Sequence, residues 1–413
     1  MHAALQTDDI LDAIFDYLKP PFGRFDHHCS SSDPIRVFQR TLCAAALTCR
    51  AFSQPALKSL WFHVNSVDAL FYILSSCMKI VCDVPLSLDI DDSPRHQETV
   101  WIMDRPVSEK ERERFLWYTQ CIHIINLQAS RRVDPWVFFR LSQENLGTPL
   151  TPRLHTMICN QDWPYIDMVV SLLSGPSLRT LALKFNGPEW TIDDDRKLPL
   201  NRHNYAAYPL LRNVCASAPD LEKLTVYMCA YPGLLHPIGG MKRLRVLDLS
   251  LVWTPINMEL VRQLAQLEQL EELALHNSFD GRNLGPCEGF KSVTKLIIRG
   301  GIRTIPPLLQ ALPDLHLREL HLNSPVIEEP RPLQKLVSAL SLASRESIES
   351  VRIDSLTAGR SLTSAPVSTL IAPFFALPNI RSFYLRADDP LCIADDDLRV
   401  IGGKWAKLDR DVI

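Results

Sequence analysis

The sequence predicts an α/β fold: a solenoid of short strands and helices, preceded by a small all-helical module. A hexapeptide, Leu-x-x-Leu-x-Leu with apolar substitutes, recurs over the last two thirds of the 413-residue chain. Segments with helical spacing of apolar residues lie between its copies, so strands and helices alternate. Units of this kind bury their apolar sides against each other and stack into an array.

The spacing of the hexapeptide indicates the kind of array. Most neighbouring copies start 23 to 32 residues apart, in or just above the roughly 20 to 29 residues of a leucine-rich repeat. We therefore expect a ribonuclease-inhibitor-like leucine-rich-repeat solenoid, with a parallel concave sheet and outer helices, over residues 116–413. The clearest copies begin at Leu178, Leu221, Leu244, Leu270, Val293, Leu317, Ile348 and Ile380, and weaker ones at Leu154 and around Ile124.

Within each copy, side chains alternate between the two faces of the strand. In LRTLAL, Leu181 and Leu183 are expected to face the core, while Thr180, Ala182 and Lys184 face outward. The outward side chains of all copies form the concave face, where mixed charge with tyrosine and arginine favours a protein partner. We predict eight partner-contacting residues on this face: Tyr227, Asp248, His276, Arg299, His321, Arg352, Tyr384 and Arg386.

The all-helical module is predicted at residues 1–64. Apolar residues at helical spacing define a first helix over residues 5–18, and Thr7 is placed to cap its N-terminus. The stretch that follows is rich in proline, glycine and serine. It predicts an inserted loop at residues 20–38.

Further helices complete the module and lead toward the repeats. Helical spacing resumes with Phe38, and a third helix is expected to follow Ser53, with Pro55 in its first turn. Ser66 is placed to cap a fourth helix. Because the sequence then turns polar and proline-interrupted, residues 65–115 are interpreted as a helix and an irregular connector.

The longest gap between copies, 43 residues from Leu178 to Leu221, is interpreted as an insertion at residues 186–208. A degenerate repeat is the alternative, but no hexapeptide of the right shape lies inside the gap. Insertions in solenoids map to loops and often carry function.

Charge and cysteine content limit the partners and the compartment. The formal net charge is −3 with no run of lysine and arginine, so we expect no nucleic-acid partner and no membrane partner. Eleven scattered cysteines, many in apolar runs such as Leu42-Cys43-Ala44, are interpreted as small buried hydrophobes in a reducing compartment. The chain shows no signal peptide and no run of eighteen apolar residues. We expect a cytoplasmic and/or nuclear protein.

The sequence carries no motif of catalysis or cofactor binding, such as a phosphate-binding glycine loop, GxSxG or HExxH. His27-His28-Cys29 looks like part of a metal site, but no second pair at zinc-like spacing follows. The acidic clusters at 89–92, 193–195 and 395–397 lack the pattern of a calcium loop. We expect no catalytic residues, no metal, no cofactor and no intrinsic enzyme activity.

The first sixty-odd residues resemble an F-box, in the segments LQTDDILDAIFDYL and RTLCAAALTCRAFSQPALKSLWFHV. With the repeats, nearly the whole chain resembles the F-box and leucine-rich-repeat proteins of fungi. The resemblance implies a substrate-recognition subunit of a Skp-cullin-F-box ubiquitin ligase, whose chemistry belongs to other subunits. The helices would bind the Skp adaptor, and through it a cullin-RING ligase, while the concave face holds an unidentified protein substrate. The implied adaptor-binding residues are Leu5, Ile10, Leu11, Ile14, Leu18, Leu57 and Trp61.

Two features depart from the F-box pattern. Gln6 stands where the family has proline, and the loop at 20–38 is longer than usual. The alternative function is therefore a leucine-rich-repeat interaction scaffold that no longer engages the ligase. A third alternative function is that of a small-molecule receptor whose solenoid pocket is covered by residues 186–208. The chain continues past the last repeat through Trp405 without an obvious cap, so we expect an abbreviated final unit or a partner covering it.

Overall fold

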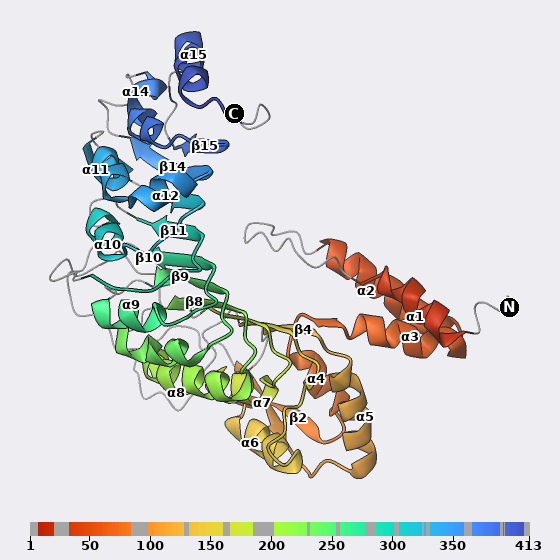
Figure 1. The fold of residues 1–413 in the computed structure, drawn as a ribbon. Helices are drawn as coiled ribbons and strands as arrows, with labels where there is room; N and C mark the ends of the chain where they lie inside the picture. Colours follow the sequence, from red (N-terminus) through yellow and green to blue (C-terminus); the bar gives the residue numbers. More distant parts are fainter. Residues whose placement is uncertain are drawn as a thin grey trace, which may run out of the picture. The chain divides into compact units, whose positions relative to one another are not determined.

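The computed structural model describes residues 7–19, 33–83, 98–127, 132–159, 166–184, 202–228, 232–252, 257–276, 286–300, 305–323, 326–327, 331–358, 366–388, 391 and 393–408. The chain divides into two compact units, Met1–Thr180 and Leu181–Ile413. Figure 1 shows their helices and strands coloured along the sequence. Residues 20–32, 185–201 and the predicted anchor Leu5 lie outside the described residues, as does His27-His28-Cys29.

The first unit begins with three helices, α1 (Asp8–Asp16), α2 (Asp33–Thr48) and α3 (Arg50–Leu60). Their shared core joins Leu11 and Phe15 of α1, Leu42 of α2 and Ala56 of α3, none more than 4% exposed. The rings of Phe15 and Phe52 meet edge to face with centroids 5.7 Å apart. Burial of these apolar side chains, at about 1.5–3 kcal/mol for each large one, holds three short helices together.

The helix boundaries correct two expectations. The loop expected at residues 20–38 is shorter, because α2 already begins at Asp33. Pro34 suits the first turn of a helix, so a proline in the stretch interpreted as a loop instead lies at the start of α2. The third helix begins at Arg50 instead of after Ser53, which places Pro55 inside it. Cys43, expected to be buried, is exposed on α2.

Short strands and helices make up the rest of the first unit. They are β1 (His63–Val64), α4 (Asp68–Ile73), β2 (Met78–Asp83), β3 (Glu98–Met103), α5 (Glu109–Gln120), β4 (Ile124–Leu127), β5 (Arg132–Val133), α6 (Pro135–Glu144), β6 (Thr156–Cys159) and α7 (Ile166–Leu173). Strands β1, β4 and β6 pair in parallel. Strands β2 and β3 form an antiparallel pair joined by β5, a small sheet that the repeat pattern did not predict.

A repeated hydrogen-bond step connects the parallel strands of the first unit. The carbonyl of Phe62, just before β1, accepts hydrogen bonds from the N–H groups of His123 and Ile124, both at 3.0 Å. The carbonyl of His123, just before β4, accepts in the same way from His155 and Thr156. Because the first step already involves Phe62, the array starts directly after α3 and not at residue 116.

The second unit alternates strands with helices throughout. Its elements are β7 (Thr180–Lys184), α8 (Arg202–Ser217), β8 (Lys223–Met228), η2 (Pro232–Gly240), β9 (Val246–Val252), α9 (Met258–Leu264), β10 (Glu272–His276), β11 (Lys295–Arg299), α10 (Ile305–Ala311), β12 (Glu319–Asn323), β13 (Val326–Ile327), α11 (Arg331–Ala339), α12 (Leu342–Ser347), β14 (Ser350–Ala358), α14 (Val367–Ile371), η4 (Ala372–Ala376), β15 (Ser382–Ala387) and α15 (Asp395–Lys404). In Figure 1 the helices from α8 to α11 line one side of these strands.

The strands of the second unit form a parallel sheet in the order β8-β9-β10-β11-β12-β14, and β15 also pairs with β14. The carbonyl step of the first unit recurs at each of these strands; for example, Glu271 O accepts from Thr294 N at 2.9 Å and Lys295 N at 3.1 Å. Side chains alternate between buried and half-buried along β9, β11 and β12. The predicted leucine-rich-repeat solenoid and its inward leucines are therefore confirmed.

The last helix closes the described end of the second unit. Trp405, just after α15, is 1% exposed, with its ring centroid 4.9 Å from that of Phe383 and 5.2 Å from that of Phe375. The Asp397 carboxylate accepts hydrogen bonds from the Ser368 hydroxyl and from Ala394 N, which ties α15 to the preceding unit. The final strand thus has a helical cover that the sequence pattern did not reveal.

Burial of His63 predicts a loss of stability in acid. Its side chain is 4% exposed, and burial lowers its pKa to about 4. The unfolded chain takes up a proton near pH 6.5, whereas the folded chain does so only near pH 4. Stability therefore falls as the pH drops between these values, by about 2 kcal/mol at pH 5 from His63 alone. Urea unfolding at pH 7.5 and at pH 5 measures this loss of stability. His63→Gln should reduce the loss, and His316→Gln, the control at an exposed site, should not. Equal losses in the unmodified chain and both variants would contradict the prediction.

Candidate protein-interaction surfaces

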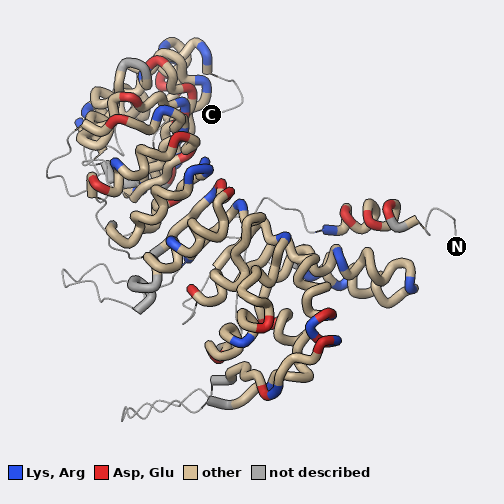
Figure 2. The backbone as a smooth tube through the Cα atoms, turned by 60° about the horizontal axis from the view of Figure 1, so that its bottom comes forward, with Lys and Arg blue, Asp and Glu red and all other residues tan. Residues whose placement is uncertain are grey.

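An apolar stripe lies on the outside of the helical module. Ile10, Ile14 and Tyr17 follow each other at i, i+4 and i+7 and are 41%, 43% and 89% exposed. Residues at this spacing share one face of a helix; we call these three the α1 stripe. Figure 2 shows acidic positions repeated along α1. Two acidic residues of this helix are paired, Asp12 with Lys58 and Asp16 with Lys19. The stripe therefore lies beside the core face of α1, whose Leu11, Phe15 and Leu18 each follow a stripe residue by one position, and its three side chains are left open.

The predicted adaptor-binding residues divide between this stripe and the interior. Leu11 is 1% exposed and belongs to the core of the module, so it is not available to a partner, and Leu18 packs against the same core. Leu57 is half-buried. Trp61 is half-buried too and packs on Tyr118, with ring centroids 4.7 Å apart. Helical periodicity identified apolar positions correctly, but it could not tell which of two apolar faces packs inward.

Exposed apolar residues of the module that the resemblance did not include are Tyr17 on α1 and Val37 and Leu47 on α2. Val37 is 60% exposed and Leu47 is 87% exposed. No sequence signal marks these residues, because an apolar residue in a helix has the same pattern whether it is packed or exposed.

The second surface is the face of the parallel sheet that its helices leave uncovered; we call it the open face. Four of the eight predicted residues share one strand register, in which Asp248, Ala274, Ile297, His321, Arg352 and Tyr384 follow from strand to strand. His276 and Arg299 stand side by side in the next register. These six residues therefore lie in the strand positions that the hexapeptide pattern predicts.

Two of the eight residues lie where the strand register shifts. The pairing of β8 with β9 shifts after Thr225, so Tyr227 lies opposite Leu251 instead of Ser250. The pairing of β14 with β15 shifts between Ile353 and Leu356, which changes the neighbours of Arg386. A one-residue slip of this kind leaves the hexapeptide unchanged, so the pattern could not show it.

Arg352 is the most constrained of the predicted anchors. Its guanidinium lies 2.5 Å from the Asp354 carboxylate and 4.5 Å from the centroid of the Tyr384 ring. The Asp354 hydrogen bond raises the pKa of Arg352 above its usual value. Preorganised arginine and tyrosine side chains lose little entropy when a partner binds, which makes them suitable anchors.

The two histidines of the open face stay neutral near pH 7. Burial, with the positive charge of Arg299, lowers the pKa of His276 below its usual value. Burial and the charge of Lys295 also lower the pKa of His321, whose Nε2 lies 3.6 Å from Glu319. Neutral imidazoles offer one donor and one acceptor each, which suits polar contacts with a protein.

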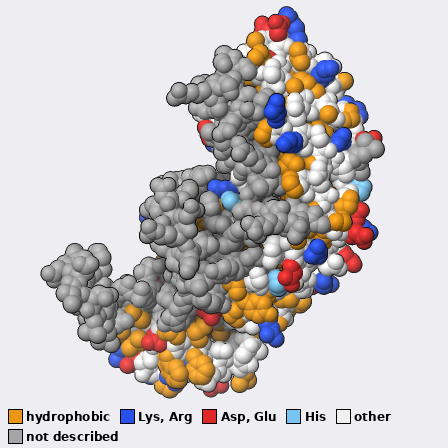
Figure 3. Space-filling model, turned by 90° about the vertical axis from the view of Figure 1, so that its left-hand side faces the viewer, with side chains coloured by type: hydrophobic (Ala, Val, Ile, Leu, Met, Phe, Trp, Pro, Cys, Tyr) orange, Lys and Arg blue, Asp and Glu red, His pale blue; other side chains and the backbone are white. Residues whose placement is uncertain are grey.

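The visible surface of the molecule is mixed in charge and polarity. Figure 3 shows side chains of both charges interspersed with apolar ones on the visible face. Within the described ranges, no group of three His, Cys, Asp or Glu side chains is arranged to hold a metal ion. No helix of this part of the chain is long and apolar enough to cross a membrane.

Comparison with known proteins gives likenesses of fold only. No family model matches the sequence, and no curated protein matches it. An internalin from Listeria monocytogenes aligns at 16% identity with a TM-score of 0.32, over 71% of this chain and 62% of that chain, less than two thirds of its length. The PEPR1-AtPEP1 structure aligns at 13% identity with a TM-score of 0.28, over 71% and 35% of the two chains. A leucine-rich-repeat protein from Leptospira interrogans gives 13% identity and a TM-score of 0.21, over 73% and 86%.

The fold assignment follows from the chain's own geometry. The repeated carbonyl step, the parallel register and the alternating burial define a leucine-rich-repeat solenoid without reference to a relative. Such solenoids present an extended sheet face that commonly binds proteins. The class of protein that the fold defines is a leucine-rich-repeat solenoid.

Proposed function

We propose that this chain is the substrate-recognition subunit of a Skp-cullin-F-box ubiquitin ligase. The α1 stripe would dock a Skp-type adaptor, and the open face would hold a protein substrate. The chain itself would carry out no chemistry, and its contribution would be to hold the substrate close to the subunits that transfer ubiquitin. The protein would work in the cytoplasm, the nucleus or both.

The observation that carries the proposal is the exposed α1 stripe on a module whose core is complete without it. Exposed apolar side chains gathered on one face are typical of protein-docking sites, because they gain energy when a partner buries them. A helical stripe at i, i+4 and i+7 is one recurrent form of such a site.

A second observation supports a mechanical role for the module. After α3 the chain passes through Trp61 and Phe62 directly into β1, and the Phe62 carbonyl accepts the first of the repeated hydrogen-bond steps. The module therefore joins the first strands without a flexible linker. The helical module would therefore be held directly against the first strands of its own unit.

The proposal is tested by affinity purification from cells in which the ligase is inhibited, so that substrates persist. The baits are the full-length chain and a chain lacking residues 1–60; the deletion stops there because Phe62 and β1 hold β4. We expect the full-length chain to retain adaptor, cullin and substrate, and the shortened chain to retain substrate alone. Equal adaptor retention by both baits contradicts the proposal. Absence of adaptor from both, with a folded array, favours the non-ligase scaffold.

A further inference from the structure

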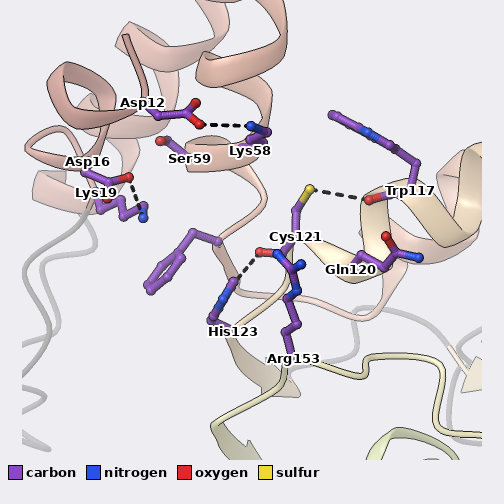
Figure 4. Close-up of a pocket in the computed structure, with 11 residues that line it drawn as sticks. Asp12, Asp16, Lys19, Lys58, Ser59, Trp117, Gln120, Cys121, His123 and Arg153 are labelled. Carbon is purple, nitrogen blue, oxygen red and sulfur yellow. Dashed lines mark hydrogen bonds and ion pairs between the residues drawn. The ribbon is translucent and has the colours of Figure 1, made fainter. Parts of the chain in front are cut away.

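A cavity of about 450 Å³ lies within the first unit, where the helical module meets the first strands of the array. Figure 4 shows the side chains that line it, which come from α1, α3, α5 and the segments around β4 and β6. Its size is within the range of small-molecule pockets in proteins, roughly 300–1,000 Å³. Its lining is unusual for such a pocket because five of the side chains are charged: Asp12, Asp16, Lys19, Lys58 and Arg153.

Four of these charges form two closed pairs. The Lys58 ammonium lies 3.0 Å from the Asp12 carboxylate, and the Lys19 ammonium lies 2.6 Å from that of Asp16. Each lysine is therefore compensated within the lining. Because the two pairs are neutral, the fifth charged side chain of the lining, Arg153, determines the net charge of the cavity.

Among the described residues, Arg153 is the cation of the lining that has no acidic partner. No acidic side chain of the described residues lies within ion-pair distance of its guanidinium. Burial raises the pKa of Cys121 and lowers that of His123, and the positive charge of Arg153 opposes the first shift and adds to the second. Guanidinium groups bind carboxylates and phosphates through paired hydrogen bonds, so a cavity with one unpaired arginine favours an oxyanion.

The uncharged walls add a flat, partly apolar surface. One side of the Phe62 ring stacks on His123 with centroids 4.6 Å apart, and the Lys19 ammonium lies 4.4 Å from the ring centroid. Trp117 and the Gln120 amide complete the lining, and the Cys121 thiol is tied to Trp117 O at 3.3 Å. An aromatic wall beside a cation suits a ring that carries an acidic group.

We propose that this cavity binds a small organic anion, a planar ring with a carboxylate or phosphate group, through Arg153. The acidic group lies against the guanidinium, and the ring lies against Trp117, because His123 and the Lys19 ammonium already cover the Phe62 ring. The site is separate from the α1 stripe and the open face, and it goes beyond the proposed ligase function.

The test uses the full-length chain without any partner and measures binding by calorimetry. The probes are phenyl phosphate and benzoate, with benzylamine as a ring of opposite charge. We expect one or both anions to bind, benzylamine not to bind, and Arg153→Ala to weaken anion binding about tenfold or more. Arg112→Ala, an exposed arginine on α5, is the matched control and should bind like the unmodified chain. Circular dichroism checks that both variants are folded.

Three outcomes overturn the proposal. They are no binding of either anion, binding of benzylamine as tight as that of the anions, and unchanged anion binding by folded Arg153→Ala. Preference for phenyl phosphate over benzoate assigns the natural ligand to phosphates, and the reverse assigns it to carboxylates. Because the assay contains no adaptor, its result is independent of whether the chain joins a ligase.

Discussion

Replacing Ile10 or Ile14 with aspartate is expected to weaken binding of a Skp-type adaptor by about 30-fold or more, since loss of an anchor side chain costs about 2 kcal/mol or more. Each isoleucine is about two-fifths exposed and adjoins Tyr17 on the α1 stripe. A carboxylate there must lose its hydration when the partner covers it, and it adds charge to an already acidic helix. The measurement is the dissociation constant of the purified full-length chain for the adaptor.

The matched control is Ile80→Asp. Ile80 is also 41% exposed but lies on β2, outside the helical module. It should bind the adaptor as the unmodified chain does. Equal weakening by all three substitutions, or no weakening by any of them, contradicts docking through the α1 stripe.

Leu296→Ala is expected to lower the free energy of unfolding of the second unit by about 2–5 kcal/mol. Leu296 is 1% exposed, and its strand neighbours in register are Leu273 and Leu320, both at most 1% exposed. The substitution leaves a cavity in the leucine column. Because each repeat is stabilised by its neighbours, faster exchange should spread from β11 to β10 and β12. Hydrogen exchange followed by mass spectrometry measures this spread strand by strand.

The control is Lys295→Ala on the same strand. Lys295 faces the other side and pairs with Glu272 at 3.0 Å, and a pair this exposed is worth about 1 kcal/mol or less. Exchange in β10 to β12 should hardly change. If Leu296→Ala also left these strands protected, the leucine column would not be the core of the array.

The repeated hexapeptide was sufficient to predict the solenoid because its geometry is local. Apolar positions two residues apart must face the same side of a strand, and burial of that side is the main source of stability. Leu181, Leu183 and the corresponding leucines of later copies therefore lie where the pattern placed them. The columns of the open face followed from the same rule.

The start of the array could not be predicted because its signal is a backbone contact. Strand β1 has two residues, too few to carry a hexapeptide, and its place in the sheet is defined by the Phe62 carbonyl. The antiparallel pair of β2 and β3 lies within residues 65–115, a range that the sequence pattern indicated to be a helix and an irregular connector. Long-range pairing of short strands leaves little trace in local periodicity.

The candidate sites could be predicted only in part, because they too depend on contacts between residues that are far apart in the sequence. Apolar spacing identified the first helix, but which side of α1 packs on α3 depends on three helices together, so Leu11 and Ile14 could not be told apart. The charged cavity joins Asp12 and Arg153, which are far apart in the sequence. Its existence depends on how the helical module meets the first strands.

The central claim is that this solenoid works as the substrate-recognition subunit of a ligase, and its most direct test is complex formation with a purified adaptor. The full-length chain and a Skp-type adaptor are mixed at micromolar concentration and analysed by size-exclusion chromatography with light scattering. We expect a stable one-to-one complex, which Ile14→Asp weakens. Two separate peaks from a chain whose array is folded would contradict it.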